Sequence, residues 1–171
     1  MTLEKALAGK EIPEEIRREL ALVELSYIGF DGLSHQGRLV LHKELVEDAI
    51  QIFAELAARR FPIERIEPVV AYGWDDDASM AANNTSAFNY RMNVHTPTKL
   101  SSHALGRAID LNPALNPFIK GDRILPPGAT YDIRVLGTVT EEVADLFKKR
   151  GWKWGGDWQD RKDWQHFEKP A

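Results

Sequence analysis

The chain has 171 residues, 43% of them apolar, which is enough for one domain to bury a core without disulfide or metal support. The net charge of −4 argues against a nucleic-acid partner, because phosphate-binding surfaces are usually basic. Cysteine is absent, which excludes thiolate metal sites, disulfides and thiol nucleophiles. No apolar run approaches the roughly 18 residues of a membrane span, so none is expected.

The first third of the sequence predicts two helices with two strands between them. Ile12 to Glu24 is expected to be a helix, because a proline and two glutamates suit its first turn and apolar residues recur at helical spacing. Leu25 to Phe30 and Arg38 to His42 are expected to be strands joined by a segment rich in turn residues. Leu45 to Arg60 is the clearest helix, with apolar residues on one face and a proline after its end.

Shorter elements follow in the middle of the chain. Ile66 to Tyr72 is expected to be a strand. Asp75 to Asp77 are placed to cap a short helical turn that runs to Ala82. Ser86 to Val94 and Ala108 to Leu111 are expected to be further strands.

The last third is expected to contain a loop and one more helix. Asn112 to Gly128 is rich in proline, which indicates a loop or excursion. Thr140 to Arg150 is expected to be a helix, with Thr138 and Glu141 at the spacing of a capping box and Gly151 as the C-terminal cap.

These elements mix helices and strands without regular alternation of strand, helix and strand. That pattern predicts an α+β fold with a small antiparallel sheet flanked by helices. We expect one domain over residues 1–171, in which the helices and hairpin of residues 1–65 pack on a core formed by residues 66–171.

Two short segments gather residues that can bind a metal and activate water. They are Ser102-His103-Ala104-Leu105-Gly106-Arg107-Ala108-Ile109-Asp110 and Asp163-Trp164-Gln165-His166-Phe167-Glu168. A hydrolytic zinc site needs three ligands, an open position for water and a nearby carboxylate that is not a ligand. Asp110 lies among apolar residues, where an ionised carboxylate needs a cation or hydrogen bonds to compensate it. Asp163 and His166 are three residues apart, a spacing that can place both on one side of a turn.

Spacing alone leaves other interpretations open. His103 by itself is more often a hydrogen-bonded loop histidine, and Asp110 is more often a strand-end or helix-capping acid. Asp163 and His166 are more often a surface ion pair. Residue types and spacing therefore permit a metal site without requiring one.

The two segments resemble motifs of the zinc D-alanyl-D-alanine carboxypeptidase family, which includes L-alanyl-D-glutamate endopeptidases. The first resembles the signature S-x-H-x-x-G-x-A-x-D, with Ser102 taken as its serine, and the second resembles an acid-x-x-His motif. The resemblance extends from about Val70 to Glu168. It implies a small sheet that carries one Zn²⁺ per chain.

The same resemblance implies a role for each motif residue. His103, Asp110 and His166 are expected to be the zinc ligands and Asp163 the general base that activates the zinc-bound water. Ser102 is expected to form a hydrogen bond with Asp110 or with backbone and so to support the ligands.

Residues upstream and between the motif positions are assigned more loosely. The segment from Ser86 to Arg91 is similar to the family strand whose arginine binds the scissile carbonyl oxygen, so Arg91 is the candidate for that role. Ser86 is a candidate for supporting the site or contacting substrate. Arg107 occupies a variable position and is expected to be solvated. His95 is a candidate for the border of the cleft.

The resemblance implies a metallopeptidase acting on peptidoglycan peptides that contain D-amino acids. The expected activity is L-Ala-D-Glu endopeptidase or D-Ala-D-Ala carboxypeptidase; the alternative is a non-catalytic zinc domain or wall-peptide-binding domain on the same fold. We expect a monomer. The first ten residues do not form a signal peptide, so the chain as written is expected to be cytoplasmic, or periplasmic or extracellular if a signal was trimmed or if the protein is released as a lysin.

Overall fold

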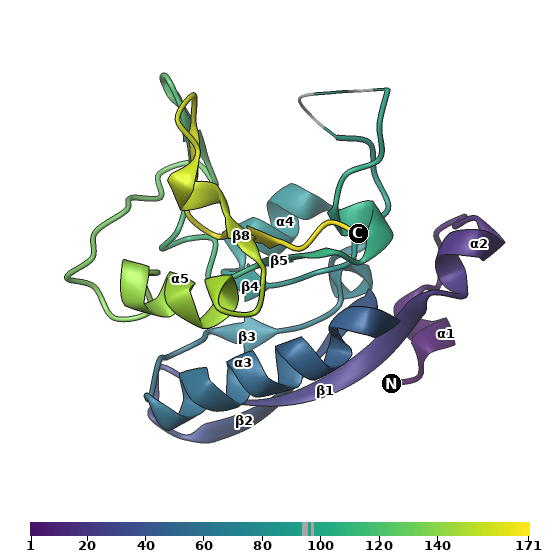
Figure 1. Ribbon diagram of the computed structural model, residues 1–171, viewed down its shortest axis with the longest axis horizontal. Helices are drawn as coiled ribbons and strands as arrows, with labels where there is room; N and C mark the ends of the chain where they lie inside the picture. Colours follow the sequence, from purple (N-terminus) through teal and green to yellow (C-terminus); the bar gives the residue numbers. More distant parts are fainter. Residues whose placement is uncertain (94–95, 97) are drawn as a thin grey trace.

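A long β-hairpin with one helix lying along it forms one side of the molecule (Figure 1). The structure is a computed structural model that describes residues 1–93, 96 and 98–171. Its helices are α1 (Leu3–Ala6), α2 (Glu14–Arg17), α3 (Val46–Ala58), α4 (Asp76–Ala81) and α5 (Glu141–Lys148). Its short 3-10 turns are η1 (Lys43–Leu45), η2 (Val69–Tyr72), η3 (His103–Leu105) and η4 (Gly155–Asp157).

The strands form several small sheets, which confirms the predicted α+β class. They are β1 (Leu20–Ile28), β2 (Ser34–His42), β3 (Arg65–Ile66), β4 (Asn84–Thr85), β5 (Ala108–Asp110), β6 (Phe118–Lys120), β7 (Arg123–Leu125), β8 (Lys153–Trp154), β9 (Lys162–Asp163) and β10 (His166–Glu168). β1 pairs with β2, β10 lies between β5 and β8, and β6 lies between β7 and β9, all antiparallel. Only the two-residue pair of β3 and β4 is parallel among the described strands.

The main core joins the N-terminal hairpin to the strands of the C-terminal part. The buried face of α3, with Ile52 and Phe53, packs in one cluster with Phe167 of β10 and Phe147 of α5. The rings of Phe147 and Phe167 stack with centroids 3.7 Å apart. Because Phe167 follows His166 directly, this stack fixes the strand that presents His166. A second cluster of buried side chains, centred on Leu20, Val40 and Phe88, covers the opposite face of the hairpin together with α1.

The predicted helix from Ile12 to Glu24 is largely wrong. Its helical part ends at Arg17, and β1 begins at Leu20. From Val23 to Tyr27 buried and exposed residues alternate, which is the period of a strand, and β2 pairs with the whole segment. Nine-residue pairing outweighs the weak local preference for a helix. The two strands are therefore longer than the sequence predicted.

Three further predictions need correction. Ile66 to Tyr72 is not one strand: it is interrupted at Pro68, which has no amide to donate to a ladder, and Val69–Tyr72 forms a 3-10 turn. The segment Asn112 to Gly128 is not only a loop, since it contains the β6–β7 hairpin. The N-cap of α5 is Thr140, whose side chain accepts from the amide of Val143, rather than Thr138. The helices over α3 and α4 and the strand β5 agree with prediction.

The predicted strand Ser86 to Val94 is wrong over its described part, and Val94 lies outside the described residues. The described part forms no continuous ladder, and its backbone bonds to separate segments of the chain instead. The amide of Asn89 donates to the carbonyl of His103, and the amide of Phe88 donates to that of Val40. Only bridges at Ser86 and Met92 pair with Asp110 and Leu100.

Arg107 is buried rather than solvated and ties the hairpin to the first motif. It is 8% exposed, its guanidinium pairs with Glu44, and it donates to the carbonyl of Lys169 at 3.3 Å. Beside it the amide of His42 donates to the carbonyl of Gly106 at 2.8 Å. Gly106 has a φ of +66°, and a Cβ there would lie 2.6 Å from the His42 nitrogen, so the contact requires glycine.

Phe147→Ala should lower the free energy of unfolding by about 3–5 kcal/mol, because it removes the ring stacked on Phe167 and leaves a cavity. Urea denaturation of the metal-free protein measures this loss. Leu136→Ala is the control, since Leu136 is 77% exposed and its loss should change stability by less than about 0.5 kcal/mol. A similar effect of the two substitutions would contradict the assigned core.

Candidate metal centre

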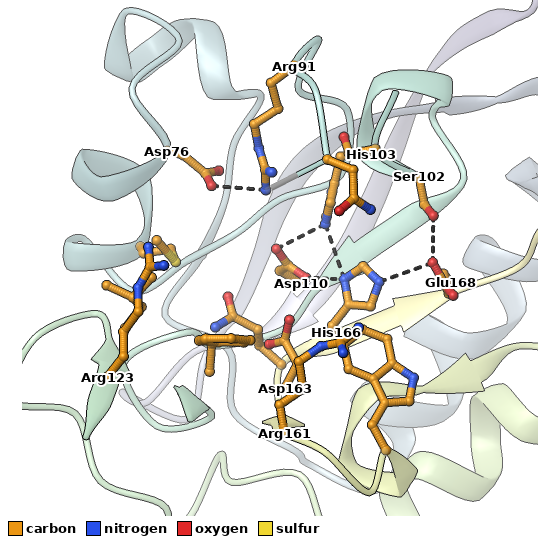
Figure 2. Close-up of a pocket in the computed structure, with 17 residues that line it drawn as sticks. Asp76, Arg91, Ser102, His103, Asp110, Arg123, Arg161, Asp163, His166 and Glu168 are labelled. Carbon is orange, nitrogen blue, oxygen red and sulfur yellow. Dashed lines mark hydrogen bonds and ion pairs between the residues drawn. The ribbon is translucent and has the colours of Figure 1, made fainter. Parts of the chain in front are cut away.

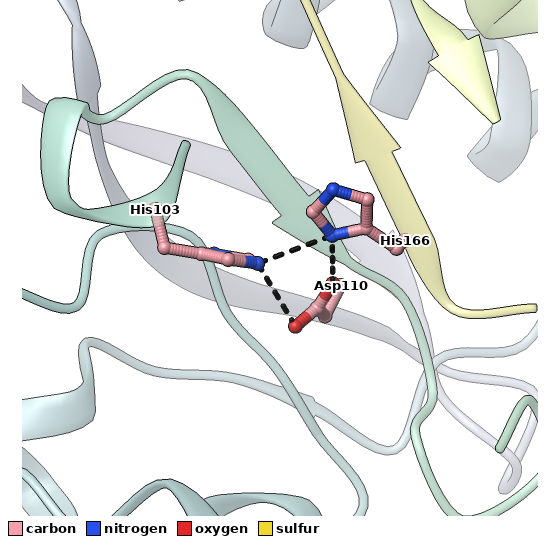
Figure 3. A group of neighbouring side chains, drawn as sticks. All are labelled: His103, Asp110 and His166. Carbon is pink, nitrogen blue, oxygen red and sulfur yellow. Dashed lines mark hydrogen bonds and ion pairs between the residues drawn. The ribbon is translucent and has the colours of Figure 1, made fainter. Parts of the chain in front are cut away.

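Two neighbouring strands and one short turn place three potential metal ligands in one buried cluster. His166 of β10 and Asp110 of β5 are paired directly across the antiparallel ladder, so their side chains leave the same face. His103 comes from η3, and the chain reverses at Gly106 before entering β5. All three side chains are buried and point toward one another (Figure 3). The register of β5 and β10 therefore brings the three side chains together, which the spacing of these residues in the sequence could not establish.

The distances inside this cluster are short. Nε2 of His103 lies 3.2 Å from Oδ2 of Asp110 and 3.2 Å from Nδ1 of His166. Nδ1 of His166 lies 3.0 Å from Oδ1 of Asp110. One ligand atom of each residue lies within 4.8 Å of the others. Ligands bound at about 2.1 Å to a tetrahedral ion lie about 3.4 Å apart, so the donor set fits such an ion.

Both histidines have their outer ring nitrogen directed at an oxygen acceptor. Nδ1 of His103 lies 2.5 Å from the carbonyl of Ala87, and Nε2 of His166 lies 3.4 Å from Oε2 of Glu168. An outer nitrogen that donates a proton leaves the inner nitrogen with a free lone pair. With both imidazoles neutral, two lone pairs and a carboxylate would face one another in a buried space, which is the arrangement a cation stabilises.

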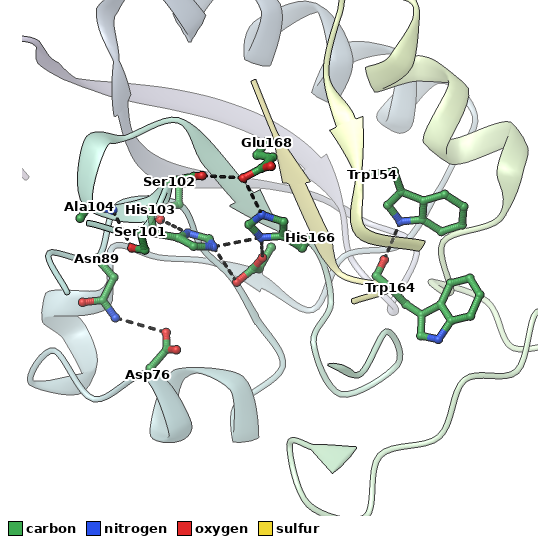
Figure 4. Close-up of polar contacts among 12 residues, drawn as sticks. Asp76, Asn89, Ser101, Ser102, His103, Ala104, Trp154, Trp164, His166 and Glu168 are labelled. Atoms are coloured by element: carbon green, nitrogen blue, oxygen red, sulfur yellow. Dashed lines mark hydrogen bonds and ion pairs between the residues drawn. The ribbon is translucent and has the colours of Figure 1, made fainter. Parts of the chain in front are cut away.

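Glu168 is a site residue that the sequence interpretation missed. Ser102 donates to Oε2 of Glu168 at 2.5 Å, and the same carboxylate faces His166, so Ser102, Glu168 and His166 form a chain (Figure 4). The expected bond from Ser102 to Asp110 or to backbone is wrong. The signal was present, because residues two apart on a strand share a face.

The signature's serine, two residues before His103, is Ser101 rather than Ser102. The Oγ of Ser101 accepts from the amide of Ala104 at 3.1 Å and so caps the turn that carries His103. Both serines are among the residues that line the cavity beside the cluster. Ser101 thus shapes the loop, while Ser102 orients Glu168.

Without a metal, the cluster holds its charges in unusual states. Burial alone would raise the pKa of Asp110, but the two histidines lower it. Burial would lower the pKa of His166, but its hydrogen bonds with Asp110 and Glu168 raise it to about 10. The hydrogen bond with His166 lowers the pKa of Glu168 to about 2, with a smaller contribution from Ser102. The carboxylates of Asp110 and Glu168, which lie beside the imidazoles, are therefore held in their ionised forms.

Asp163 stands beside the cluster but is not part of it (Figure 2). Its Oδ1 is buried and has no hydrogen-bond partner among the described residues. Burial raises the pKa of this carboxyl to about 7, and repulsion by Asp110 adds to the rise while His166 opposes it. A carboxyl with a pKa near neutrality can both accept and return a proton, which suits a general base.

A cavity of about 190 Å³ opens onto these residues (Figure 2). Its charged and aromatic lining residues include Asp76, Arg91, His103, Asp110, Phe118, Arg123, Trp158, Arg161, Asp163, His166 and Glu168. The ring of Trp158 lies 5.4 Å from that of His166 and forms one wall. The cavity thus gives a ligand access to both the cluster and Asp163.

Of the two candidate site residues upstream of the first motif, Arg91 lies at the cavity and Ser86 does not. Arg91 lines the cavity, and its guanidinium pairs with Asp76 of α4 at 3.0 Å. Ser86 is not among the residues that line the cavity. It exchanges both backbone hydrogen bonds with Asp110 and so holds β5 in place. His95, the candidate for the cleft border, lies outside the described residues.

Residues 94–169 match the protein family described as D-alanyl-D-alanine carboxypeptidase. This stretch contains both motif segments, and the match confirms the family resemblance predicted from them. It begins after Arg91 and Ser86, so the resemblance upstream of the first motif is not covered. No curated protein and no solved structure matches the chain.

Among the described residues, no helix is long and apolar enough to cross a membrane.

Glu168→Ala should weaken Zn²⁺ binding by about 10- to 100-fold, because His166 loses the acceptor that orients its ring. Competition with a chromogenic chelator measures the affinity. The control is Glu142→Ala on the exposed face of α5, which should bind Zn²⁺ as the unchanged protein does. Equal affinities in the two variants would show that Glu168 does not orient a metal ligand.

Asp163→Asn should make the metal-free protein more stable at neutral pH. The folded-state pKa of Asp163 is about 7, above the ordinary aspartate value of 3.8, so stability is lost as pH rises between these values and the charge forms in the buried site. The advantage of the variant should therefore grow from pH 4 to pH 7, measured by urea denaturation. In the control Asp132→Asn no such gain is expected, because hydrogen bonds from Arg134 lower the pKa of Asp132 to about 2.

Proposed function

We propose that this protein is a zinc metallopeptidase that hydrolyses peptidoglycan-type peptides containing D-amino acids. The observation that carries the proposal is the buried cluster of two histidines and one aspartate, with a separate carboxyl of raised pKa on the same cavity. The match of residues 94–169 to the D-alanyl-D-alanine carboxypeptidase family supports the same reaction class. A purely structural zinc usually has four protein ligands, whereas here three candidate ligands stand beside a separate carboxyl.

In this proposal His103, Asp110 and His166 hold one Zn²⁺, and both histidines coordinate through their inner nitrogens. When bound, the ion supplies Lewis-acid activation of water and of the scissile carbonyl. Ala87 and Glu168 keep the two imidazoles in the required tautomers. Zinc suits this donor set, since two imidazoles and a carboxylate leave one tetrahedral position for water.

Asp163 acts as the general base in the proposed reaction. It takes a proton from the attacking water and later returns it to the leaving amine, so no covalent intermediate with the protein is required. Its raised pKa supports this role, because the proton is held strongly enough to be accepted and weakly enough to be released. Its free Oδ1 leaves the carboxylate available to the water.

Arg91 is proposed to bind the carbonyl oxygen as negative charge develops on it. The ion pair with Asp76 at 3.0 Å fixes its guanidinium at the cavity wall. A donor held in place before the reaction stabilises an oxyanion better than a mobile one. Asp76 in turn accepts from the side chain of Asn89 at 3.2 Å, so the pair is itself held in place.

The substrate is proposed to be an L-Ala-D-Glu or a D-Ala-D-Ala peptide. An aspartate three residues before the last histidine, with Phe-Glu after that histidine, resembles the L-Ala-D-Glu endopeptidases, as does the segment from Gly151 to Trp158. The matched family, by contrast, is described by its carboxypeptidase activity. The expectation of a monomer stays a prediction. The cellular compartment also stays a prediction: the cytoplasm for the chain as written, or the periplasm or extracellular space if a signal was trimmed or the protein is released as a lysin.

Asp163→Ala should retain about one Zn²⁺ per chain and lose at least about 100-fold in kcat, because only the proton acceptor is removed. Metal content is measured by elemental analysis, and hydrolysis by mass analysis of defined muropeptides, which also identifies the cleaved bond. Asp157→Ala, an exposed acid on η4, is the matched control and should hydrolyse at the unchanged rate. Full zinc with no hydrolysis by the unchanged protein would instead favour a non-catalytic zinc domain.

A further inference from the structure

The cavity wall away from the metal cluster is formed by a hairpin that is joined directly to the strand carrying Asp163. β6 pairs on one side with β7 and on the other with β9. In this register Phe118 is opposite Leu125 on one side and opposite Asp163 on the other. The hairpin is therefore fixed relative to the proposed base by backbone hydrogen bonds rather than by loop contacts.

The same register places Arg123 on the cavity face. Residues two apart on a strand share a face, so Arg123 points to the side of Leu125, Phe118 and Asp163, and all four line the cavity. Leu125 and Asp163 are two strand spacings apart, or about 10 Å, and Arg123 lies about 7 Å farther along β7. In Figure 2 Arg123 stands across the drawn pocket from Glu168. Its long side chain can thus reach a substrate group one or two residues from the scissile bond.

The arginines of this cavity differ in their partners. Arg91 is paired with Asp76 at 3.0 Å, and Arg161 is paired with Asp160 at 2.6 Å while it lies over the ring of Trp158 at 4.4 Å. The Arg123 side chain has no hydrogen bond or ion pair among the described residues. It is exposed, so its charge costs little in the empty protein and remains available to a ligand.

We propose that Arg123 is a specificity-determining residue that binds a carboxylate of the substrate one or two residues from the cleaved bond. This inference rests on the proposed function and assigns, within it, the residue that recognises a carboxylate beside the scissile bond. A guanidinium offers two parallel donors to a carboxylate, and a carboxamide cannot accept both. The hairpin between the two motifs thereby serves as a recognition element.

The test measures binding separately from hydrolysis. Zinc-loaded Asp163→Asn protein provides a background that does not turn over substrate, and calorimetry measures its affinity for two matched peptide pairs. One pair is L-Ala-D-γ-Glu-L-Lys and the same peptide with the α-carboxylate of D-Glu as carboxamide. The other is L-Lys-D-Ala-D-Ala and its C-terminal carboxamide.

Adding Arg123→Gln should weaken binding of the free acid of at least one pair by about 10-fold or more and binding of its amide by less than about 2-fold. Arg123→Lys should retain part of the preference, because it keeps the charge but not the paired donors. Lys120→Gln is the matched control. It removes one positive charge from the same hairpin at an exposed residue that is not among those lining the cavity, and should leave the preference intact.

Several outcomes would overturn the inference. These are equal losses for acid and amide in both pairs, an equal effect of Lys120→Gln, or no binding of any of the four peptides. Failure of the proposed function has a different signature, since the protein with Asp163 intact would then bind the acid peptides through Arg123 but cleave none of them.

Discussion

The structure depends on one electrostatic constraint: a buried carboxylate and two imidazole nitrogens face one another within about hydrogen-bond distance. Asp110 could not remain ionised in this setting without compensation, and the inner nitrogens of His103 and His166 point at the same space with their outer nitrogens already committed to oxygen acceptors. A divalent cation satisfies all three groups at once. In the C-terminal part, the surrounding strands and turns hold these three side chains in place, and a cavity opens beside them.

The means of holding them are distributed along the chain. Backbone pairing of β5 with β10 sets Asp110 against His166, and Gly106 allows the hairpin to approach closely enough to fix the turn that carries His103. The stack of Phe147 on Phe167 anchors β10 from the core side. Because the N-terminal hairpin contributes to that same core, residues far from the cavity determine its geometry.

The cavity beside the cluster is lined by a carboxyl whose pKa is raised rather than lowered. Asp163 is kept out of the metal cluster, on a strand whose neighbours form a separate small sheet, and burial without a hydrogen-bond partner gives it a pKa suited to proton transfer. That sheet continues to the hairpin with Arg123. Asp163 and Arg123 are thereby carried by one small sheet, whereas Asp110 and His166 are carried by another, and all four residues line the same cavity.

The sequence by itself indicated a family, a reaction class and the residues that could carry it, through the residue types and order of the two motifs, and the helical spacing of apolar residues located α3. It did not determine where the remaining groups lie. The strand identity of residues 20–24, the burial of Arg107 and the hydrogen bond from Ser102 to Glu168 depend on contacts between segments distant in the chain, and local patterns cannot encode a partner. Tertiary structure alone decided that His103, Asp110 and His166 converge while Asp163 stays separate, because sheet register, not spacing along the chain, sets which side chains share a face.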